Sequence, residues 1–304
     1  MALTKEIISD WFQSLQSDIC EAVEKEDGKG EFRTDQWEHA NGGGGESRIL
    51  LNGKVLEKAG VNFSAVEGDA PEALLTTLEV KKESDEQLRF FASGVSIVMH
   101  PKSPMVPIIH MNVRYFELSN GVYWFGGGID LTPHIVDKTQ AAYFHKQLKK
   151  VCDVHDQDYY PKFKKWADDY FFLPHRNETR GVGGIFFDRL KEDVSKSKED
   201  IFEFVKGVGV VFAPTYTHLM HINKDQPFEE KHTQWQNLRR GRYVEFNLVW
   251  DRGTKFGLQT GGRTESILMS MPPVARWDYD YQLEEDFEKE TAALLKKDVD
   301  WLGE

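Results

Sequence analysis

Three polar side chains at alternate positions of one short segment are the first sign of chemistry in this 304-residue sequence. His110, Asn112 and Arg114 alternate with apolar or aromatic residues, and alternate residues of a β-strand point to the same face. Histidine exchanges protons near neutral pH, and a guanidinium binds a carboxylate through two parallel hydrogen bonds. The spacing predicts a site for an anionic ligand, and a solvated outer face of a sheet is the alternative.

Two further segments would bring polar faces close to this one. Residues 93–100 place Ser96 and His100 on one face of a predicted strand. Residues 243–251, which we predict to form another strand, place Asp251 on the same face as two other polar residues. Three strands therefore offer polar faces that could converge.

The segment 239–263 is locally basic in an acidic chain. The whole sequence has 50 acidic and 38 basic residues and a formal net charge of −12, whereas this segment has six basic and two acidic residues. So acidic a chain argues against general binding of nucleic acid, which needs a basic surface. The local excess of arginine favours a small polyanionic ligand or a dimer interface, with surface salt bridges as the alternative.

Glycine runs at 126–128 and 261–262 permit sharp turns and close approach of backbone N–H groups to an anion. Neither has the spacing of a dinucleotide-binding motif, and turn geometry alone would also explain them. Residues 41–45 read Asn-Gly-Gly-Gly-Gly without the Gly-Lys-Ser/Thr ending of a phosphate-binding loop. They predict a flexible loop.

Metal-binding and nucleophilic signals are weak. His100, His110, His145 and His175 could supply an all-nitrogen metal site, but their spacing matches no short zinc pattern such as His-Glu-x-x-His. The chain has two cysteines, too few for a disulfide framework or a thiolate zinc site. This cysteine usage fits a reducing compartment.

Hydrophobic periodicity indicates the elements that must position these residues. Apolar residues recur every three or four positions in residues 1–26, which predicts an amphipathic helix. Residues 137–154, 160–172, 198–220 and 282–297 also have helical patterns.

Strands are predicted across residues 90–128. Asn120-Gly121 separates two apolar runs there, which predicts a hairpin with a type I′ turn. Because strands and helices do not alternate regularly, an antiparallel sheet is favoured over a parallel one. We expect an α+β fold in which a large antiparallel β-sheet is flanked on both faces by α-helices, as a single domain over residues 1–304.

The sequence also bears on location. No apolar run approaches the ~20 residues that a membrane-spanning helix needs. The first 26 residues match neither a secretory signal nor an arginine-rich mitochondrial presequence. We expect no membrane span and a cytoplasmic location.

Several longer motifs resemble the signature of the oxygen-dependent coproporphyrinogen III oxidases. The longest is KWADDYFFLPHRNETRGVGGIFFD at 165–188, and the resemblance extends from about Trp11 to the C-terminus. Ala167 stands where the family signature usually has Cys. The other matching blocks are GVS (94–96), NVRYFE (112–117), GIDLTP (128–133), YVEFN (243–247), DRGTKFGL (251–258) and GGRTES (261–266).

The resemblance implies an enzyme of haem biosynthesis. The family converts the propionates on rings A and B of coproporphyrinogen III to vinyl groups, uses O2, releases two CO2 and forms protoporphyrinogen IX. It needs no organic cofactor, forms homodimers and has a large antiparallel sheet flanked by helices. The expected partners are coproporphyrinogen III and a second copy of this chain, with no nucleic acid.

Matching positions imply roles for individual residues. Asp251 is the first choice for the base that removes a pyrrole proton, and Asp130 is the second, as a partner base or as a hydrogen-bond acceptor for a pyrrole. His110 matches the proton donor. Arg114 and Arg263 would hold propionates. The substrate-binding positions that match, together with one arginine beside the base, are Ser96, Asn112, Val113, Arg114, Arg252, Gly261, Gly262 and Arg263.

The resemblance also implies a divalent ion at the four histidines, as some family members have one. The reaction does not demand it, because electron-rich pyrroles can react with O2 once a pyrrole N–H is removed. His175 and residues 243–278 match regions tied to dimerisation. The alternative functions are a non-catalytic tetrapyrrole-binding protein and a metal-dependent enzyme that uses the histidine cluster.

Overall fold

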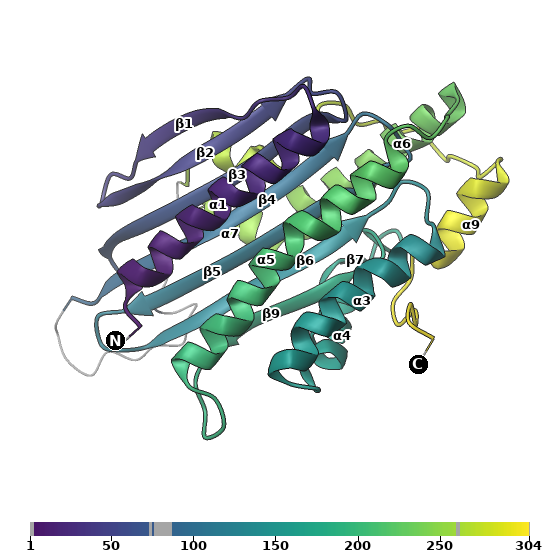
Figure 1. The fold of residues 1–304 in the computed structure, drawn as a ribbon. Coiled ribbons are helices and arrows are strands. Elements are labelled where there is room, and N and C mark those ends of the chain that lie inside the picture. The colour runs from purple at the N-terminus through teal and green to yellow at the C-terminus, as the bar shows by residue number, and fades with distance from the viewer. Residues whose placement is uncertain (1–2, 73–74, 76–86, 260–261, 304) are drawn as a thin grey trace.

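Seven strands form one antiparallel sheet in the order β1-β2-β3-β4-β5-β6-β9 (Figure 1). The structure is a computed structural model and describes residues 3–72, 75, 87–259 and 262–303. A two-stranded ribbon, β7 and β8, lies apart from the sheet. The strands are β1 (Arg33–Glu38), β2 (Gly43–Leu51), β3 (Leu56–Asp69), β4 (Arg89–Pro101), β5 (Ile108–Leu118), β6 (Tyr123–Thr132), β7 (Phe172–Leu173), β8 (Glu178–Thr179) and β9 (Gly184–Leu190).

Helices flank both faces of the sheet, so the expected α+β fold is confirmed. The helices α1, α3 and α5 cover the face toward the viewer in Figure 1, and α7 lies behind the sheet. The helical elements are α1 (Lys5–Asp27), α3 (Lys138–His155), α4 (Tyr159–Tyr170), α5 (Lys198–Asn223), α6 (Glu230–Glu245), the π-helix η1 (Phe246–Trp250), α7 (Arg252–Gln259), α8 (Thr264–Leu268) and α9 (Asp286–Leu294). None of the helices in these described ranges is long and apolar enough to cross a membrane.

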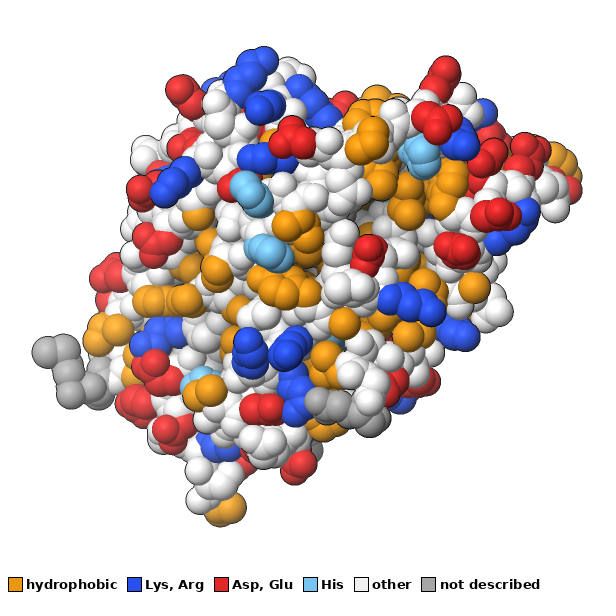
Figure 2. Space-filling model, turned by 45° about the vertical axis from the view of Figure 1, so that its right-hand side comes forward, with side chains coloured by type: hydrophobic (Ala, Val, Ile, Leu, Met, Phe, Trp, Pro, Cys, Tyr) orange, Lys and Arg blue, Asp and Glu red, His pale blue; other side chains and the backbone are white. Residues whose placement is uncertain are grey.

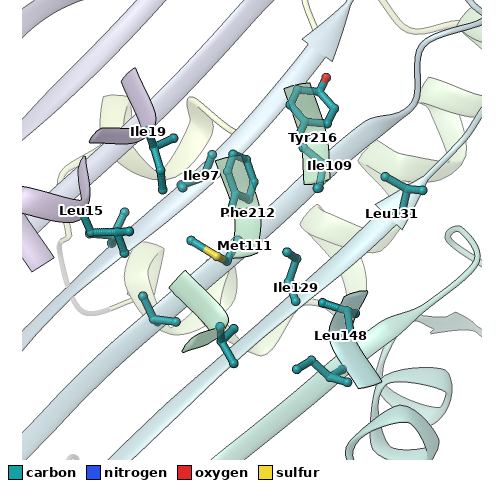
Figure 3. Packing of buried hydrophobic residues seen from close by; sticks show 14 of the residues in the cluster. Leu15, Ile19, Ile97, Ile109, Met111, Ile129, Leu131, Leu148, Phe212 and Tyr216 are labelled. Atoms are coloured by element: carbon teal, nitrogen blue, oxygen red, sulfur yellow. The ribbon is translucent and has the colours of Figure 1, made fainter. Parts of the chain in front are cut away.

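The main core lies between the sheet and the helices α1, α3 and α5. Ile97, Met111 and Ile129 come from neighbouring strands and face Leu15 of α1 and Phe212 of α5 (Figure 3). All five side chains are buried, and burying each one contributes about 1.5–3 kcal/mol. Since one face of β4, β5 and β6 is used for this core, their polar residues must point to the other face.

The helix boundaries agree with the sequence patterns at most positions. Thr4 accepts a hydrogen bond from the Ile7 N–H at the start of α1, and Ser197 forms a capping box with Asp200 at the start of α5. The predicted C-terminal helix is shorter than expected, since α9 ends at Leu294.

The hairpin between β5 and β6 is confirmed, but its turn is not type I′. The Leu118 N–H donates to the Val122 oxygen at 2.8 Å, and the Gly121 N–H donates to the Leu118 oxygen at 3.0 Å. Gly121 has a φ of 86°, whereas Asn120 is not among the residues with positive φ. The loop is therefore a type I turn closed by a left-handed glycine, which suits a three-residue connection.

Two predictions from the sequence were wrong. The segment 41–45 is not a flexible loop: Gly44 and Gly45 belong to β2 and pair with strands on both sides. A Cβ on Gly44 would lie 2.3 Å from the Trp37 carbonyl oxygen, so these glycines allow close packing rather than mobility.

The segment 243–251 is not a strand either. It forms the end of α6 and all of η1, with Tyr243, Phe246 and Asn247 buried. Phe246 and Asn247 lie three and four residues after Tyr243, which is the spacing of one helix face. Short apolar runs rich in β-branched and aromatic residues do not distinguish strand from buried helix by composition alone.

Charge is evenly mixed on the visible part of the surface. On the face that Figure 2 shows, basic side chains lie scattered among acidic and apolar ones. This distribution agrees with the overall acidic composition and offers no extended basic field on that face.

Candidate active site

The strand register brings the predicted polar residues together on one face of the sheet. His110 lies opposite Asp130, and Asn112 lies opposite Ser96. Ser96 and Arg114 are exposed, while His110 and Asn112 are half-buried. The Asn112 side-chain oxygen has no hydrogen-bond partner within the described residues, so it is an acceptor that a ligand could use. The predicted polar face is thus present on β4 and β5, whereas the third predicted segment, 243–251, adds no strand to it.

His110 is held by a buried carboxylate. Its Nδ1 lies 2.8 Å from Asp130 Oδ1, and Asp130 is only 1% exposed. The Arg180 guanidinium donates to both oxygens of this carboxylate, each at 2.7 Å. Both oxygens of Asp130 are therefore engaged inside the protein, and Asp130 orients the imidazole while Nε2 of His110 remains toward Asn112.

Electrostatics keeps Asp130 ionised. Burial alone would raise the pKa of this carboxyl, but the charge of Arg180 and the hydrogen bond from His110 bring it below its usual value. A buried guanidinium needs compensation as well, and Arg180 also donates to the Asn247 side-chain oxygen at 2.7 Å.

Three aromatic rings enclose the Arg180 guanidinium. Its central carbon lies 4.4 Å from the ring centre of Phe171, 4.8 Å from Tyr243 and 4.7 Å from Phe246. Cation–π contacts of this kind are strongest where water is excluded. Arg180 thus links β6 to the helical segment that carries Asp251.

Asp251 is positioned by the end of the π-helix. Its N–H donates to the Phe246 oxygen at 2.9 Å, a bond across five residues that closes η1. Its carboxylate accepts the Tyr170 hydroxyl and the Thr254 N–H, each at 2.7 Å. Single π-helical turns within helices are frequent at functional sites, because the extra residue displaces the following side chain.

The surroundings of Asp251 favour the carboxylate. Burial opposes the charge, but the hydrogen bonds from Tyr170 and Thr254 and the charge of Arg180 lower the pKa of Asp251 below its usual value. Arg252 lies over the Tyr170 ring at 5.1 Å. Asp251 is therefore ionised at neutral pH and held in a fixed orientation.

The two arginines expected to bind carboxylates are both paired within the chain. Arg114 donates to Asp188 on β9 at 2.9 Å. Arg263 donates to Asp35 on β1 at 2.6 Å and also contacts two serines at the start of α8 and on β2. Each pair is partly exposed, so its net free energy is small.

The remaining predicted binding positions differ in what they can offer. The Val113 side chain lies in the core on the opposite face of β5, so only its backbone could meet a ligand. The Gly262 N–H donates to the Gly257 oxygen at 2.8 Å, which turns the chain back after α7. Gly261 lies outside the described residues.

The four histidines of the expected metal site do not come together. His100 bonds the Ser270 oxygen, His145 bonds the Tyr160 hydroxyl, and His175 bonds Glu245. Burial lowers the pKa of His100 to about 3 and that of His145 to about 4, so both are neutral. Over residues 3–72, 75, 87–259 and 262–303, no group of three or more His, Cys, Asp or Glu could hold a metal ion. These residues do not fit a metal, and we derive no step through one.

Several site residues carried no assignment from the sequence. Arg180 and Tyr170 lie within the longest motif, but nothing in their spacing indicated that they support Asp130 and Asp251. Asp35 and Asp188 are ordinary acidic residues of edge strands. The position of an arginine directly before a glycine-rich segment was the available sequence signal for Arg180.

The fold and the site together define a class of protein. A sheet face with an oriented histidine, an ionised carboxylate and several arginines can perform acid–base chemistry on a ligand that carries carboxylates. We therefore place the chain among α+β enzymes that act on polycarboxylate substrates.

Comparison with known proteins identifies the family. A sequence model described as coproporphyrinogen III oxidase matches residues 7–301. The chain belongs to the coproporphyrinogen III oxidase family. Relatives named oxygen-dependent coproporphyrinogen-III oxidase include one from Prochlorococcus marinus (strain MIT 9301), 44% identical over 96% of this chain and 91% of the relative.

Two animal relatives are similarly close. The Drosophila melanogaster protein of the same name is 47% identical over 95% of this chain and 76% of its own length. The Homo sapiens protein, named as the mitochondrial enzyme, is 48% identical over 94% of this chain and 65% of its own length. The expectation from the sequence motifs is thus confirmed at the level of the family.

Proposed function

We propose that this protein catalyses the oxygen-dependent oxidative decarboxylation of coproporphyrinogen III to protoporphyrinogen IX. The family match over residues 7–301 is the observation that carries this proposal. Each of the ring A and B propionates loses CO2, one proton and two electrons and becomes a vinyl group. The two conversions release four electrons, which O2 accepts together with protons. No organic cofactor enters this balance.

Asp251 is the proposed base for a pyrrole N–H. Support comes from its ionised state and from the two hydrogen bonds that fix its orientation. Removing this proton raises the electron density of the pyrrole, which makes the ring more reactive toward O2. Arg252 adds positive charge beside the base.

His110 is the proposed proton donor, and Asp130 acts through it. The Asp130 carboxylate stabilises a protonated His110, while Arg180 holds Asp130 in place. Since Asp130 is only 1% exposed and paired with the buried Arg180, we assign it to the orientation of His110 rather than to direct proton removal.

The substrate is proposed to lie on the polar face of β4, β5 and β6. Ser96 and Asn112 supply polar contacts, and Arg114 and Arg263 bind propionates. The backbone of Val113 lies between Asn112 and Arg114 on β5. Gly261 and Gly262 would allow the backbone to approach the substrate closely. The aromatic residues around Arg180 add apolar area for a macrocycle.

A homodimer is proposed on the basis of an exposed apolar surface. Leu248, Val249 and Trp250 of η1 and Phe256 and Leu258 of α7 are all more than a third exposed. Contiguous apolar surface of this kind often marks a protein interface. His175 stacks on Trp250 at 5.8 Å, which places it at the same surface.

We also propose that the chain is one domain and works in the cytoplasm. The seven strands share one sheet and one main core, which supports the first proposal. The buried free thiols of Cys20 and Cys152 fit a reducing compartment, which supports the second. The word mitochondrial belongs to the name of the human relative.

Turnover under controlled oxygen tests the proposed reaction. Coproporphyrinogen III is supplied to the purified chain in air and under argon, and products are separated by fluorescence-detected chromatography. We expect protoporphyrinogen IX in air and none under argon. Tight binding without product in air would indicate a tetrapyrrole-binding protein instead, and product under argon would overturn the role of O2.

A further inference from the structure

Both arginines proposed to bind propionates are occupied by carboxylates of the chain itself. Arg114 pairs with Asp188 at 2.9 Å, and Arg263 pairs with Asp35 at 2.6 Å. The two aspartates lie on β9 and β1, which are the two edge strands of the sheet. Each aspartate therefore lies on the outer side of its arginine, away from the polar floor of β4, β5 and β6.

The register gives the span between the two arginine sites. Ser47, Asn62, Ser96 and Asn112 form one row across β2 to β5, and Arg263 contacts the Ser47 hydroxyl. Three strand spacings make this row about 14 Å long. Arg114 lies two positions after Asn112 on β5, which adds roughly 7 Å along the strand, at right angles to this row. This span suits a flat macrocycle with carboxylates at opposite sides of its rim.

Small residues lie beside each of the two arginines. A Cβ on Gly126 would lie 2.7 Å from Arg114 Nε and 2.7 Å from Asp188 Oδ1. The glycine therefore leaves the room in which this pair forms. On the other side, Ser47 and Ser266 lie 3.0 Å apart beside Arg263. The neighbouring residues therefore make room for both ion pairs or contact them, so these pairs are defined features of the site.

We propose that Asp35 and Asp188 are internal competitors of the substrate propionates. Each carboxylate neutralises its arginine in the free enzyme, and a substrate carboxylate replaces it on binding while the aspartate returns to water. The proposal rests on the proposed function, since it assumes that Arg114 and Arg263 bind the substrate. It makes the two aspartates determinants of substrate affinity and of selectivity for ligands with carboxylates at both ends.

The solvent exposure of the two pairs is compatible with this exchange. The side chains of Arg114 and Asp188 are 46% and 31% exposed, and those of Arg263 and Asp35 are 28% and 37% exposed. Each partner can therefore be hydrated when the pair opens. By contrast, Arg180 and Asp130 are almost fully buried, so no ligand can replace that pair at comparable cost.

The test measures binding apart from turnover. Coproporphyrinogen III is titrated anaerobically into the wild type, Asp188→Asn and Asp35→Asn by calorimetry, and KM and kcat are then measured in air. Each substitution should lower Kd by about threefold to sixfold, because it frees an arginine held in a weak, partly exposed pair. The double variant should gain the product of the two factors, since the pairs are distant. KM should fall in parallel with Kd, because the competing carboxylate acts on binding.

Two controls separate competition from a general change in charge. Glu38→Gln removes one negative charge from the opposite face of β1 and should leave Kd unchanged. In an Arg114→Gln background, Asp188→Asn should no longer improve binding. Thermal unfolding of each variant shows that the comparison concerns folded protein.

The outcomes distinguish this inference from the proposed function. Unchanged or raised Kd in both Asn variants, with normal wild-type turnover, would overturn the competitor role alone. Raised Kd would show that the aspartates position the arginines for the substrate. A wild type that neither binds nor converts coproporphyrinogen III would overturn the proposed function and this inference with it.

Discussion

The carboxyl groups of Asp130 and Asp251 have different surroundings, and this difference assigns their roles. The oxygens of Asp130 form hydrogen bonds with Arg180 and His110 inside the protein. The oxygens of Asp251 accept hydrogen bonds from the Tyr170 hydroxyl and the Thr254 N–H. Both carboxylates have their two oxygens engaged, but Asp130 is only 1% exposed, whereas Asp251 is partly exposed at the end of η1 and can meet a ligand. This difference in exposure is the reason for proposing Asp251 as the base and Asp130 as the residue that orients His110.

Replacing Asp251 should affect turnover much more than binding. Asp251→Asn keeps the size of the side chain but cannot accept the pyrrole proton as a base. We expect kcat to fall by about 10²–10⁴-fold with little change in KM, because a general base acts mainly in the transition state. Steady-state kinetics with coproporphyrinogen III provides the measurement. A kcat close to that of the wild type would remove Asp251 from the mechanism.

Replacing Arg180 should change both stability and pH dependence. Arg180→Lys keeps a positive charge but loses the fork that binds both oxygens of Asp130. We expect the free energy of unfolding to fall by about 1–3 kcal/mol. Denaturant unfolding monitored by circular dichroism measures this loss.

The pH profile of the same variant tests the positioning role. The lowered pKa of Asp130 keeps its carboxylate charged down to acidic pH in the wild type. With Lys at position 180 that pKa rises, so the acid limb of the kcat profile should move to higher pH. A stability loss with an unchanged acid limb would mean that Arg180 is structural only.

At the scale of elements, the end of α6 is the feature that the sequence did not predict. Tyr243 and Phe246 belong to a run that suits a strand by composition, yet they pack on Arg180 as part of a helix. The helical spacing of Tyr243, Phe246 and Asn247 was present in the sequence, but composition alone favoured a strand and did not show which residues would be buried. The strand β5 was predictable because His110, Asn112 and Arg114 alternate with apolar or aromatic residues.

Glu245 closes α6 and gathers several donors. Its carboxylate accepts hydrogen bonds from His175, Arg176 and Trp277, with Arg242 nearby. Burial would raise the pKa of Glu245, but these donors lower it from 4.5 to about 2. Since the folded value is lower than the unfolded one, its stabilisation is complete above pH 4.5 and is lost as the pH falls toward 2.

Glu245→Gln should therefore matter at neutral pH and not in acid. We expect the variant to lose about 1–2 kcal/mol of unfolding free energy at pH 7. The difference from the wild type should shrink steadily between pH 4.5 and pH 2. Urea unfolding at a series of pH values measures it, and a difference independent of pH would contradict the assigned pKa.

The whole molecule combines one apolar and one functional face of a single sheet. Alternation along β4 and β5 was enough to predict which of their side chains share the polar face, and the longest motifs indicated the family. The sequence could not indicate the pairing of Arg180 with Asp130, which joins residues far apart in the chain. Nor did it indicate β1, whose Asp35 reaches across to Arg263.

The proposed dimer is testable at this scale. Leu248→Glu places a charge in the exposed apolar surface of η1 and should shift the protein to monomers in sedimentation analysis. Val210→Glu alters another exposed apolar residue, on α5, and should leave the oligomeric state unchanged. Equal behaviour of the two variants would argue against an interface at η1 and α7.

The most direct test of the account is a structure of Asp251→Asn crystallised with coproporphyrinogen III under anaerobic conditions. We expect a macrocycle on the polar face of β4, β5 and β6, with one carboxylate on Arg114 and a pyrrole N–H toward residue 251. His110 should remain bonded to Asp130. A macrocycle bound elsewhere, or with Arg114 still held by Asp188 and no carboxylate on it, would contradict the account.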